Sequence, residues 1–232
     1  MPPTLDRFPR VIARIGARWL AAAALAALVT VTTAAQQGPP SDPKATRQPE
    51  LVELVTLDPT IKLDIRYATT NNFVGKAVYQ EARAFLQRPA AEALVAAHRE
   101  LASSGYGLMI HDGYRPWAIT KLFWEVTPAA LREFVADPAS GSKHNRGAAV
   151  DLTMYDRAFG RAVVMPSGYD EMTQRAYPEY RGGPPDARGR RDLLRAVMER
   201  HGFTVEPNEW WHFNYRDWQQ YPILDIPFSA IR

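Results

Sequence analysis

The spacing of hydrophobic and polar residues predicts strands and one helix in the first half of the folded region. Apolar and polar residues alternate over Leu51–Leu57 and Ile61–Tyr67, and an Asp-Pro pair separates the two segments. This pattern predicts two strands joined by a turn. From Pro89 to Ser103, apolar residues recur at helical spacing, and Tyr106–Asp112 is a short apolar run typical of a buried strand.

The second half continues with both element types. A proline precedes the predicted helix Trp117–Val126, and a further helix is predicted over Arg190–His201. Ala149–Tyr155 alternates strictly and Trp210–Tyr215 is rich in aromatic residues, so both are predicted strands. The stretch 157–189 is rich in Gly and Pro without periodicity, and loops of that length are often functional. Mixed strands and helices without a regular βαβ rhythm indicate the α+β class.

The first 35 residues have the pattern of an export signal. An apolar run of 13 residues, Trp19–Val31, is followed by small residues up to Ala35. The run is shorter than the roughly 20 apolar residues of a membrane span, although an uncleaved anchor stays an alternative. We expect residues 1–35 to be a signal peptide and the protein to be exported, periplasmic or secreted, without stable membrane insertion after cleavage. Basic residues precede the run at Arg7, Arg10, Arg14 and Arg18.

Composition then narrows the remaining chain to one neutral domain. Residues 36–50 are polar and contain four prolines, which predicts a flexible linker. The domain is expected over 51–232. Outside the first 35 residues the chain carries 24 basic and 24 acidic residues, which argues against nucleic-acid binding. With 0 cysteines, the chain has no disulfide or thiolate chemistry, so any metal must be bound by histidines and carboxylates.

Two of the five histidines lie near acidic residues in unusual segments. His144 stands in a polar segment that leads to Asp151, and this aspartate points away from the apolar face of its strand. A surface loop and a structural salt bridge are the alternatives for this pair. His212 ends a Glu-Trp-Trp-His run that begins with Glu209. His98 and His201 fall in predicted helices, where structural roles are expected. His111 falls in a predicted strand beside Asp112, where it is either a buried residue or a neighbour of the ligands.

A catalytic zinc site uses three protein ligands and leaves one position open for water. His144, Asp151 and His212 match that number of ligands, and Glu209 is a candidate base for the metal-bound water. Residues three apart in a flat strand face opposite ways. Glu209 must therefore lie in a turn or on a bulge to reach the same site as His212.

A further candidate follows the strand that ends at Asp112. In Asp112-Gly-Tyr-Arg-Pro116, an arginine comes after a glycine turn, so Arg115 can project into a cleft as a fixed cation. An ion pair with a surface carboxylate is the alternative for this arginine.

Four segments together carry a family resemblance. DIRYATTNNFVGK (64–76), DGYRP (112–116), SKHNRGAAVDLT (142–153) and EWWHF (209–213) occur in order along nearly the whole predicted domain. The chain thus resembles the D-alanyl-D-alanine dipeptidases of the VanX type. The resemblance implies an α+β fold with a small central antiparallel sheet flanked by helices, in one zinc peptidase domain related to D,D-carboxypeptidases and hedgehog-type domains.

The resemblance also implies roles for residues. One Zn²⁺ is bound by His144, Asp151 and His212, with Glu209 as general base and then acid and Arg115 as the transition-state stabiliser. The implied reaction is hydrolysis of D-Ala-D-Ala to two D-alanines, in cell-wall turnover or glycopeptide resistance. A D,D-carboxypeptidase acting on peptidoglycan stem peptides and a non-catalytic, zinc-containing wall-binding module are the alternatives. The dipeptide pocket is implied to include Tyr67, Asp112, Ser142 and Asp170, with Asp112 and Asp170 suited to the substrate ammonium.

Overall fold

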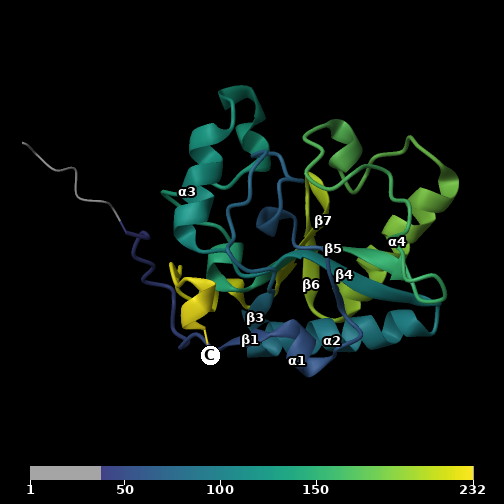
Figure 1. Ribbon diagram of the computed structural model, residues 1–232, viewed down its shortest axis with the longest axis horizontal. Coiled ribbons are helices and arrows are strands. Elements are labelled where there is room, and N and C mark those ends of the chain that lie inside the picture. Colours follow the sequence, from purple (N-terminus) through teal and green to yellow (C-terminus); the bar gives the residue numbers. More distant parts are fainter. Residues whose placement is uncertain (1–37, 232) are drawn as a thin grey trace, which may run out of the picture. The chain divides into compact units, whose positions relative to one another are not determined.

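A five-stranded sheet in the order β2-β4-β5-β7-β6 forms the centre of the computed structural model, which describes residues 38–231 (Figure 1). Neighbouring strands are antiparallel, except that β2 runs parallel to β4. This arrangement confirms the predicted α+β fold, and the small sheet, predicted to be antiparallel, differs from the prediction in its one parallel pair, β2–β4. The strands are β2 (Lys62–Leu63), β4 (Tyr106–Asp112), β5 (Ala149–Asp156), β6 (Phe203–Glu206) and β7 (Glu209–Tyr215).

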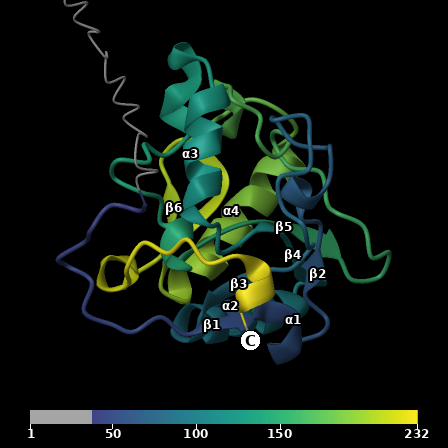
Figure 2. The ribbon, with the colours of Figure 1, turned by 60° about the vertical axis from the view of Figure 1, so that its left-hand side comes forward.

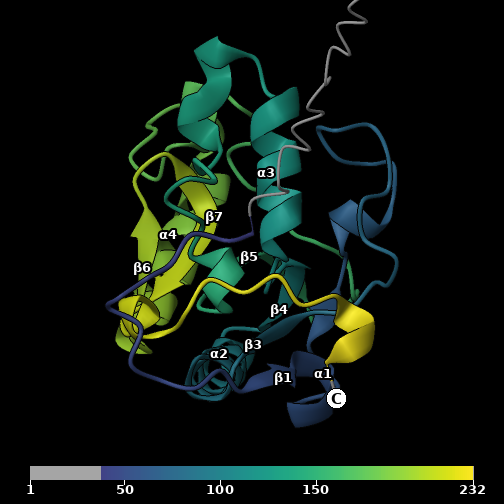
Figure 3. The same cartoon turned by 90° about the vertical axis from the view of Figure 1, so that its left-hand side faces the viewer.

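Three helices cover the sheet. The helix α2 (Arg88–Ala102) packs on β4, and α4 (Pro185–Arg200) packs on β6. The two helices also contact each other. Figures 1 and 3 show α3 (Trp117–Val126) on the other side of the strands from α4. The apolar residues of β5, such as Leu152 and Met154, are fully buried in the core. The opposite face of β5 is therefore left to polar residues, and this face carries the candidate site.

The first two predicted strands are shorter than the sequence suggests. Strand β1 (Leu51–Glu53) ends where the single-turn helix α1 (Leu54–Leu57) begins, and only β2 remains of the second predicted strand. Leu54 is completely buried. Strict alternation over a few residues fits either a strand or a short helix that buries its first residue, so the pattern misled the prediction.

The helix α4 starts five residues earlier than predicted, at Pro185. Its first five residues include Pro185 and Gly189, which resemble loop residues, but proline is well tolerated in the first turn of a helix. The short strands β3 (Phe85–Gln87), which pairs with β1, and β6 were missed. The 3-10 helices are η1 (Arg66–Ala68), η2 (Ala129–Phe134), η3 (His144–Arg146), η4 (Gln174–Ala176), η5 (Trp218–Gln220) and η6 (Phe228–Ala230).

The segment 38–50 has no regular secondary structure, yet it contacts the domain rather than extending from it. Figure 2 shows it beside the C-terminal segment, and the backbone N–H groups of Thr46 and Arg47 donate to the Gln220 carbonyl. Asp42 forms an ion pair with the buried Arg146. The predicted flexible linker is thus docked on the domain over these residues, because its charged groups find partners there.

The predictions of a signal peptide and of no stable membrane insertion remain. The predicted signal peptide, residues 1–35, lies outside the described residues. Among the helices of residues 38–231, none has both the length and the apolar character that crossing a bilayer requires.

Candidate metal centre and active-site cleft

The strand pair β5–β7 brings two of the predicted metal ligands together. Asp151 and His212 are direct partners in the antiparallel register, so their side chains leave the sheet side by side. His144 lies in the 3-10 turn η3, which ends at Gly147 with φ of 63°, a conformation that glycine adopts without strain. This turn leads directly into β5. All three side chains are buried.

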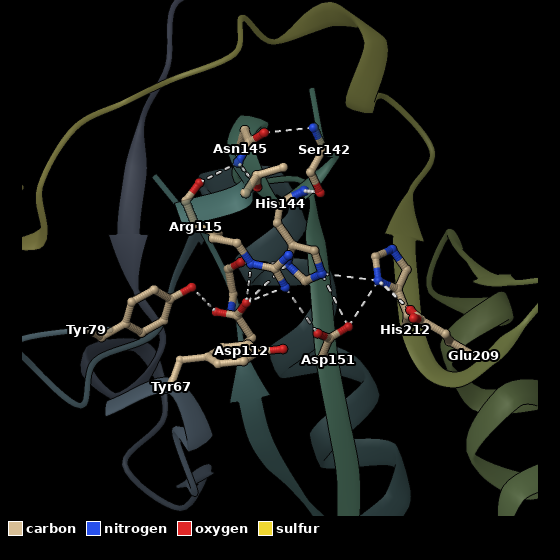
Figure 4. A network of polar contacts seen from close by, with 12 residues as sticks. Tyr67, Tyr79, Asp112, Arg115, Ser142, His144, Asn145, Asp151, Glu209 and His212 are labelled. Atoms are coloured by element: carbon tan, nitrogen blue, oxygen red, sulfur yellow. Dashed lines mark hydrogen bonds and ion pairs between the residues drawn. The ribbon is translucent and has the colours of Figure 1, made fainter. Parts of the chain in front are cut away.

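The three ligand atoms form a nearly equilateral triangle (Figure 4). The distances are 3.2 Å from His144 Nε2 to Asp151 Oδ1, 3.0 Å from His212 Nδ1 to the same oxygen, and 3.1 Å between the two nitrogens. Zinc–ligand bonds of about 2.0–2.2 Å in tetrahedral geometry imply ligand–ligand distances of roughly 3.3–3.6 Å. The observed triangle is therefore slightly smaller than one face of a zinc coordination tetrahedron.

Hydrogen bonds on the far side of each imidazole fix its orientation. His144 Nδ1–H donates to the Gly113 carbonyl at 2.7 Å, and His212 Nε2–H donates to Asn214 Oδ1 at 2.8 Å. The Asn214 amide in turn donates to Glu206 Oε2 at 2.7 Å. In the neutral imidazoles these bonds leave the nitrogen that faces Asp151 available to a metal ion, as in metal-binding histidines.

The surroundings of the Asp151 carboxylate favour a cation in this triangle. Within residues 38–231, no group donates a hydrogen bond to the buried Oδ1, whereas Oδ2 accepts one from Tyr169. A buried oxygen facing two nitrogen lone pairs is unfavourable unless a positive charge lies among them. Burial raises the pKa of Asp151, but positive charge at His144 and His212 lowers it well below the ordinary value, so the site holds the carboxylate when positive charge lies beside it. The residues present thus fit a divalent metal ion.

Glu209 reaches the same site because β7 is irregular at its start. The register between β6 and β7 shifts between Val205 and Glu206, which leaves three β7 residues without a regular partner on β6. Glu209 Oε2 consequently lies 3.5 Å from His212 Nδ1, on the same side of the strand. The predicted need for a turn or bulge is met by this irregularity. Burial raises the pKa of Glu209 to about 8, against the attraction of His212.

Arg115 enters the cleft from the side opposite Glu209, held by Asp112. Its Nε donates to Asp112 Oδ2 at 2.8 Å, and one terminal nitrogen forms an ion pair with the same oxygen at 2.7 Å. This terminal nitrogen lies 3.7 Å from Asp151 Oδ2. The guanidinium packs over the rings of Tyr67 and Phe123. It is therefore a fixed cation beside the metal ligands, as the Gly-Tyr-Arg turn suggested.

The predicted contact of Asp112 with substrate disagrees with this geometry. Its Oδ1 accepts from the Tyr79 hydroxyl at 2.8 Å and from the Gly113 N–H at 2.9 Å, while Oδ2 is bound to Arg115. Both oxygens are thus engaged in the interior, and a substrate ammonium finds no free acceptor on this carboxylate. Asp112 orients Arg115 instead.

A single asparagine locks the two loops of the site to each other. Asn145 accepts the N–H of Ser142 at 2.7 Å and donates to the Arg115 carbonyl and the Thr120 hydroxyl, both at 2.8 Å. In addition, the Arg115 N–H donates to the His144 carbonyl at 3.1 Å. The arginine and the first histidine therefore keep a constant relative position.

The metal triangle opens into a cleft of about 340 Å³. Asp170 lies on its wall with a left-handed backbone (φ 58°), and both of its oxygens accept the Tyr67 hydroxyl at 3.0–3.1 Å. Burial, with the charges of Asp151 and Glu209, raises the pKa of Asp170 well above its ordinary value. Of the predicted pocket residues, the cleft lining therefore includes Tyr67, Ser142 and Asp170.

Sequence reasoning missed three residues that surround the ligands. Tyr169, Asn214 and Glu206 each contact a metal ligand or the partner of one. Asn214 could have been found from the alternation of β7, because it is on the same face as His212 two positions earlier. The position of Tyr169 depends on the path of a loop without periodicity, and no sequence pattern indicated it.

His98 and His201 make structural contacts, as expected, whereas His111 is buried next to a residue that contacts a metal ligand. His98 Nδ1 accepts the Leu108 N–H at 2.9 Å, and His201 Nε2 lies 2.7 Å from Glu100 Oε2. His111 stacks on Tyr169 with a centroid distance of 4.6 Å and contacts the Asp64 carbonyl.

The chain is similar to known peptidases. Residues 47–229 match the D-ala-D-ala dipeptidase family of M15 peptidases. A D-alanyl-D-alanine dipeptidase of Escherichia coli strain K12 is 38% identical over 181 residues, which cover 78% of this chain and 92% of that protein. The Enterococcus faecium D-alanyl-D-alanine dipeptidase is 35% identical over 187 residues, covering 72% and 92%. Among solved structures, the LdcB LD-carboxypeptidase covers 75% of this chain and 71% of its own, with a TM-score of 0.42 and 17% identity.

The family match spans most of the chain, and the relatives are matched over nearly their full length. Family membership implies a metal cofactor, and the described residues contain the His-Asp-His cluster to bind one. The chain therefore belongs to the D-alanyl-D-alanine dipeptidase family and is a metallopeptidase.

Proposed function

We propose that this protein hydrolyses D-Ala-D-Ala to two molecules of D-alanine and that its metal is a single zinc ion. The observation that carries the proposal is the buried triangle of His144, Asp151 and His212, with Glu209 at one side and Arg115 at the other. Two imidazoles and one carboxylate with an open position are typical of catalytic zinc. Zinc in such a site makes water a nucleophile near neutral pH and polarises a carbonyl.

Glu209 is proposed as the residue that moves the proton. Its carboxylate is in place to take a proton from the attacking water as the new carbon–oxygen bond forms. The same group then delivers that proton to the leaving amine as the carbon–nitrogen bond breaks. Burial favours the protonated carboxyl and so helps this second step, in which Glu209 must act as an acid.

Arg115 is proposed to stabilise the negative charge that develops on the carbonyl oxygen. Its guanidinium is held rigidly by Asp112 and lies beside Asp151, so it needs no reorganisation when the charge appears. Removing one such preorganised donor typically costs about 10²–10³ in rate.

Asp170 is proposed to bind the free ammonium group of the dipeptide, with Tyr67 and Ser142 shaping the pocket around it. Its half-buried carboxyl lies in the cleft among other acidic groups, where a cation would stabilise the charged form. The Tyr67 hydroxyl holds the carboxyl in place by donating to its oxygens. An acceptor for a free amine favours a dipeptide over a longer chain blocked at this position.

The test combines metal analysis with product release. Purified protein should contain one zinc per chain and release free D-alanine from D-Ala-D-Ala, with little release from an N-acylated stem peptide that ends in D-Ala-D-Ala. Preference for the acylated peptide would favour a D,D-carboxypeptidase. Bound zinc without turnover of either peptide would favour a non-catalytic wall-binding module.

We also propose that the protein is exported and acts on peptides of the cell wall. The support is the basic and apolar pattern of residues 1–35, with small residues up to Ala35. Cell fractionation and N-terminal sequencing of the protein from its native host test this. Protein confined to the cytoplasm with its first 35 residues intact would contradict it.

A further inference from the structure

The two oxygens of Asp151 have different partners, and this division starts the argument. Oδ1 lies 3.2 Å from His144 Nε2 and 3.0 Å from His212 Nδ1. Oδ2 points away from them and accepts a hydrogen bond of 2.9 Å from the Tyr169 hydroxyl. The phenol therefore determines which oxygen of the aspartate is presented to a metal.

The ring of Tyr169 is fixed on several sides. It stacks on His111 at a centroid distance of 4.6 Å and meets Trp211 edge-on at 5.6 Å. Tyr67 contacts it edge-on at 6.2 Å. A ring held by three aromatic neighbours delivers its hydroxyl to one place, and so the hydrogen bond to Asp151 is geometrically constrained.

The loop that carries Tyr169 is itself attached to the sheet. Ser167 Oγ accepts the Trp210 indole N–H at 2.8 Å, which ties the loop to β7 next to the metal ligands. The following residue, Asp170, has a left-handed backbone and lines the cleft. One loop thus connects the wall of the cleft to a metal ligand through adjacent residues.

The alternative partner of Oδ2 is weaker. The terminal nitrogen of Arg115 lies 3.7 Å away, beyond hydrogen-bond distance, and the same guanidinium is already bound to Asp112. Without the phenol, the Asp151 carboxylate is free to rotate toward Arg115. Such a rotation would move Oδ1 out of the triangle.

We propose that Tyr169 is a positioning residue of the metal centre, which orients Asp151 through its hydroxyl and thereby strengthens metal binding. That the metal is zinc and serves peptide hydrolysis rests on the proposed function. The hydrogen-bonded partners of metal ligands typically contribute about 10–100-fold in metal affinity or activity.

The test is Tyr169→Phe, which keeps the ring and its aromatic contacts and removes only the hydroxyl. Zinc affinity is measured by competition with a chromophoric chelator, and the absorption spectrum of the cobalt(II)-substituted protein reports ligand geometry. Tyr155→Phe is the matched control, because its hydroxyl donates to the Thr60 carbonyl at 2.7 Å, at a site that contains no metal ligand. Both variants lose one phenol hydrogen bond.

Tyr169→Phe should bind zinc about 10–100-fold more weakly than the wild type and shift the cobalt spectrum, while Tyr155→Phe changes neither. At saturating zinc, KM for D-Ala-D-Ala should stay near the wild-type value, since Asp170 is retained. A zinc affinity within about twofold of the wild type, at equal zinc content and an unchanged cobalt spectrum, would overturn the proposal. If wild-type protein binds zinc but does not cleave the dipeptide, the proposed function fails while this comparison still decides the role of Tyr169.

Discussion

Asp151 and His212 face each other across the β5–β7 ladder, and 3.0 Å separates Asp151 Oδ1 from His212 Nδ1. Their relative position is set by backbone hydrogen bonds of the sheet rather than by a loop. Two of the three metal ligands therefore belong to paired strands of the central sheet. His144, from the turn before β5, completes the triangle.

The roles of Glu209 and His144 can be separated by substitution. Glu209→Gln should keep the metal, because Glu209 is not in the triangle, but should lower the rate of D-Ala-D-Ala hydrolysis by at least about 10²–10⁴. His144→Ala should lose both metal and activity. Metal content by atomic absorption and D-alanine release measure the two effects. Turnover retained in a metal-replete Glu209→Gln protein would remove Glu209 from proton transfer.

Asp112→Asn tests whether Arg115 depends on its carboxylate partner. The variant keeps an acceptor for the Tyr79 hydroxyl but loses the charge that holds the guanidinium. We expect metal content to be unchanged and kcat/KM to fall about 10²-fold, since small displacements of a catalytic group have effects of this size. Glu92→Gln, which removes an exposed ion pair with Arg88, is the control and should have no effect. Wild-type activity in Asp112→Asn would show that Arg115 is oriented by other contacts.

Gly147→Ala should destabilise the turn that carries His144. The backbone there has φ of 63°, and a Cβ would overlap the Leu51 side chain. A left-handed conformation costs an alanine roughly 1–2 kcal/mol before this overlap is counted. Gly189→Ala, within α4 and facing open space, should instead stabilise by about 0.5–1 kcal/mol. Denaturant unfolding of both variants measures the difference, and equal stability would contradict the turn's requirement for glycine.

His98 should make folding sensitive to acid. Burial lowers its pKa below the ordinary value of 6.5, and its Nδ1 accepts the Leu108 N–H, a bond that protonation removes. The unfolded chain therefore takes up the proton first as the pH falls. The contribution of His98 to the free energy of unfolding is complete above about pH 6.5 and decreases as the pH falls through the folded-state pKa.

An NMR titration of the His98 ring checks this sign, together with unfolding at about pH 7.5 and about pH 5.5. His98→Gln should be less stable near neutral pH but should lose less stability on acidification. A measured His98 pKa at or above 6.5 would contradict the prediction.

The sequence predicted the ligands but not the groups that orient them. His144, Asp151, Glu209 and His212 stand in short segments whose chemistry is visible in residue order, and the structure brings them together. The contact between Tyr169 and Asp151 joins a loop to a strand. Such a contact depends on the path of the whole chain, which local pattern does not determine. The role of Asp112 was misjudged for a similar reason, because its partner Tyr79 comes from a distant segment.

Among the elements, long periodic segments were predicted well and short ones were not. The helix α3 and the strand β4 have the predicted bounds. The helix has one apolar face and the strand is a continuous apolar run, so both patterns are visible in the sequence. Strands of two to four residues, such as β2 and β6, exist because a neighbouring strand pairs with them. Alternation alone cannot distinguish such pieces from a turn of helix, as α1 shows.

The ion pair between Asp42 and Arg146 affects where a shortened protein can begin. Arg146 is buried two positions after His144, and its guanidinium also donates to the Tyr221 carbonyl. A form that starts at Gln36, after processing near Ala35, keeps Asp42. A truncation to Leu51 removes this carboxylate and leaves an uncompensated charge beside the metal-binding turn. The proline-rich stretch is therefore part of what an expression vector for the catalytic domain must encode.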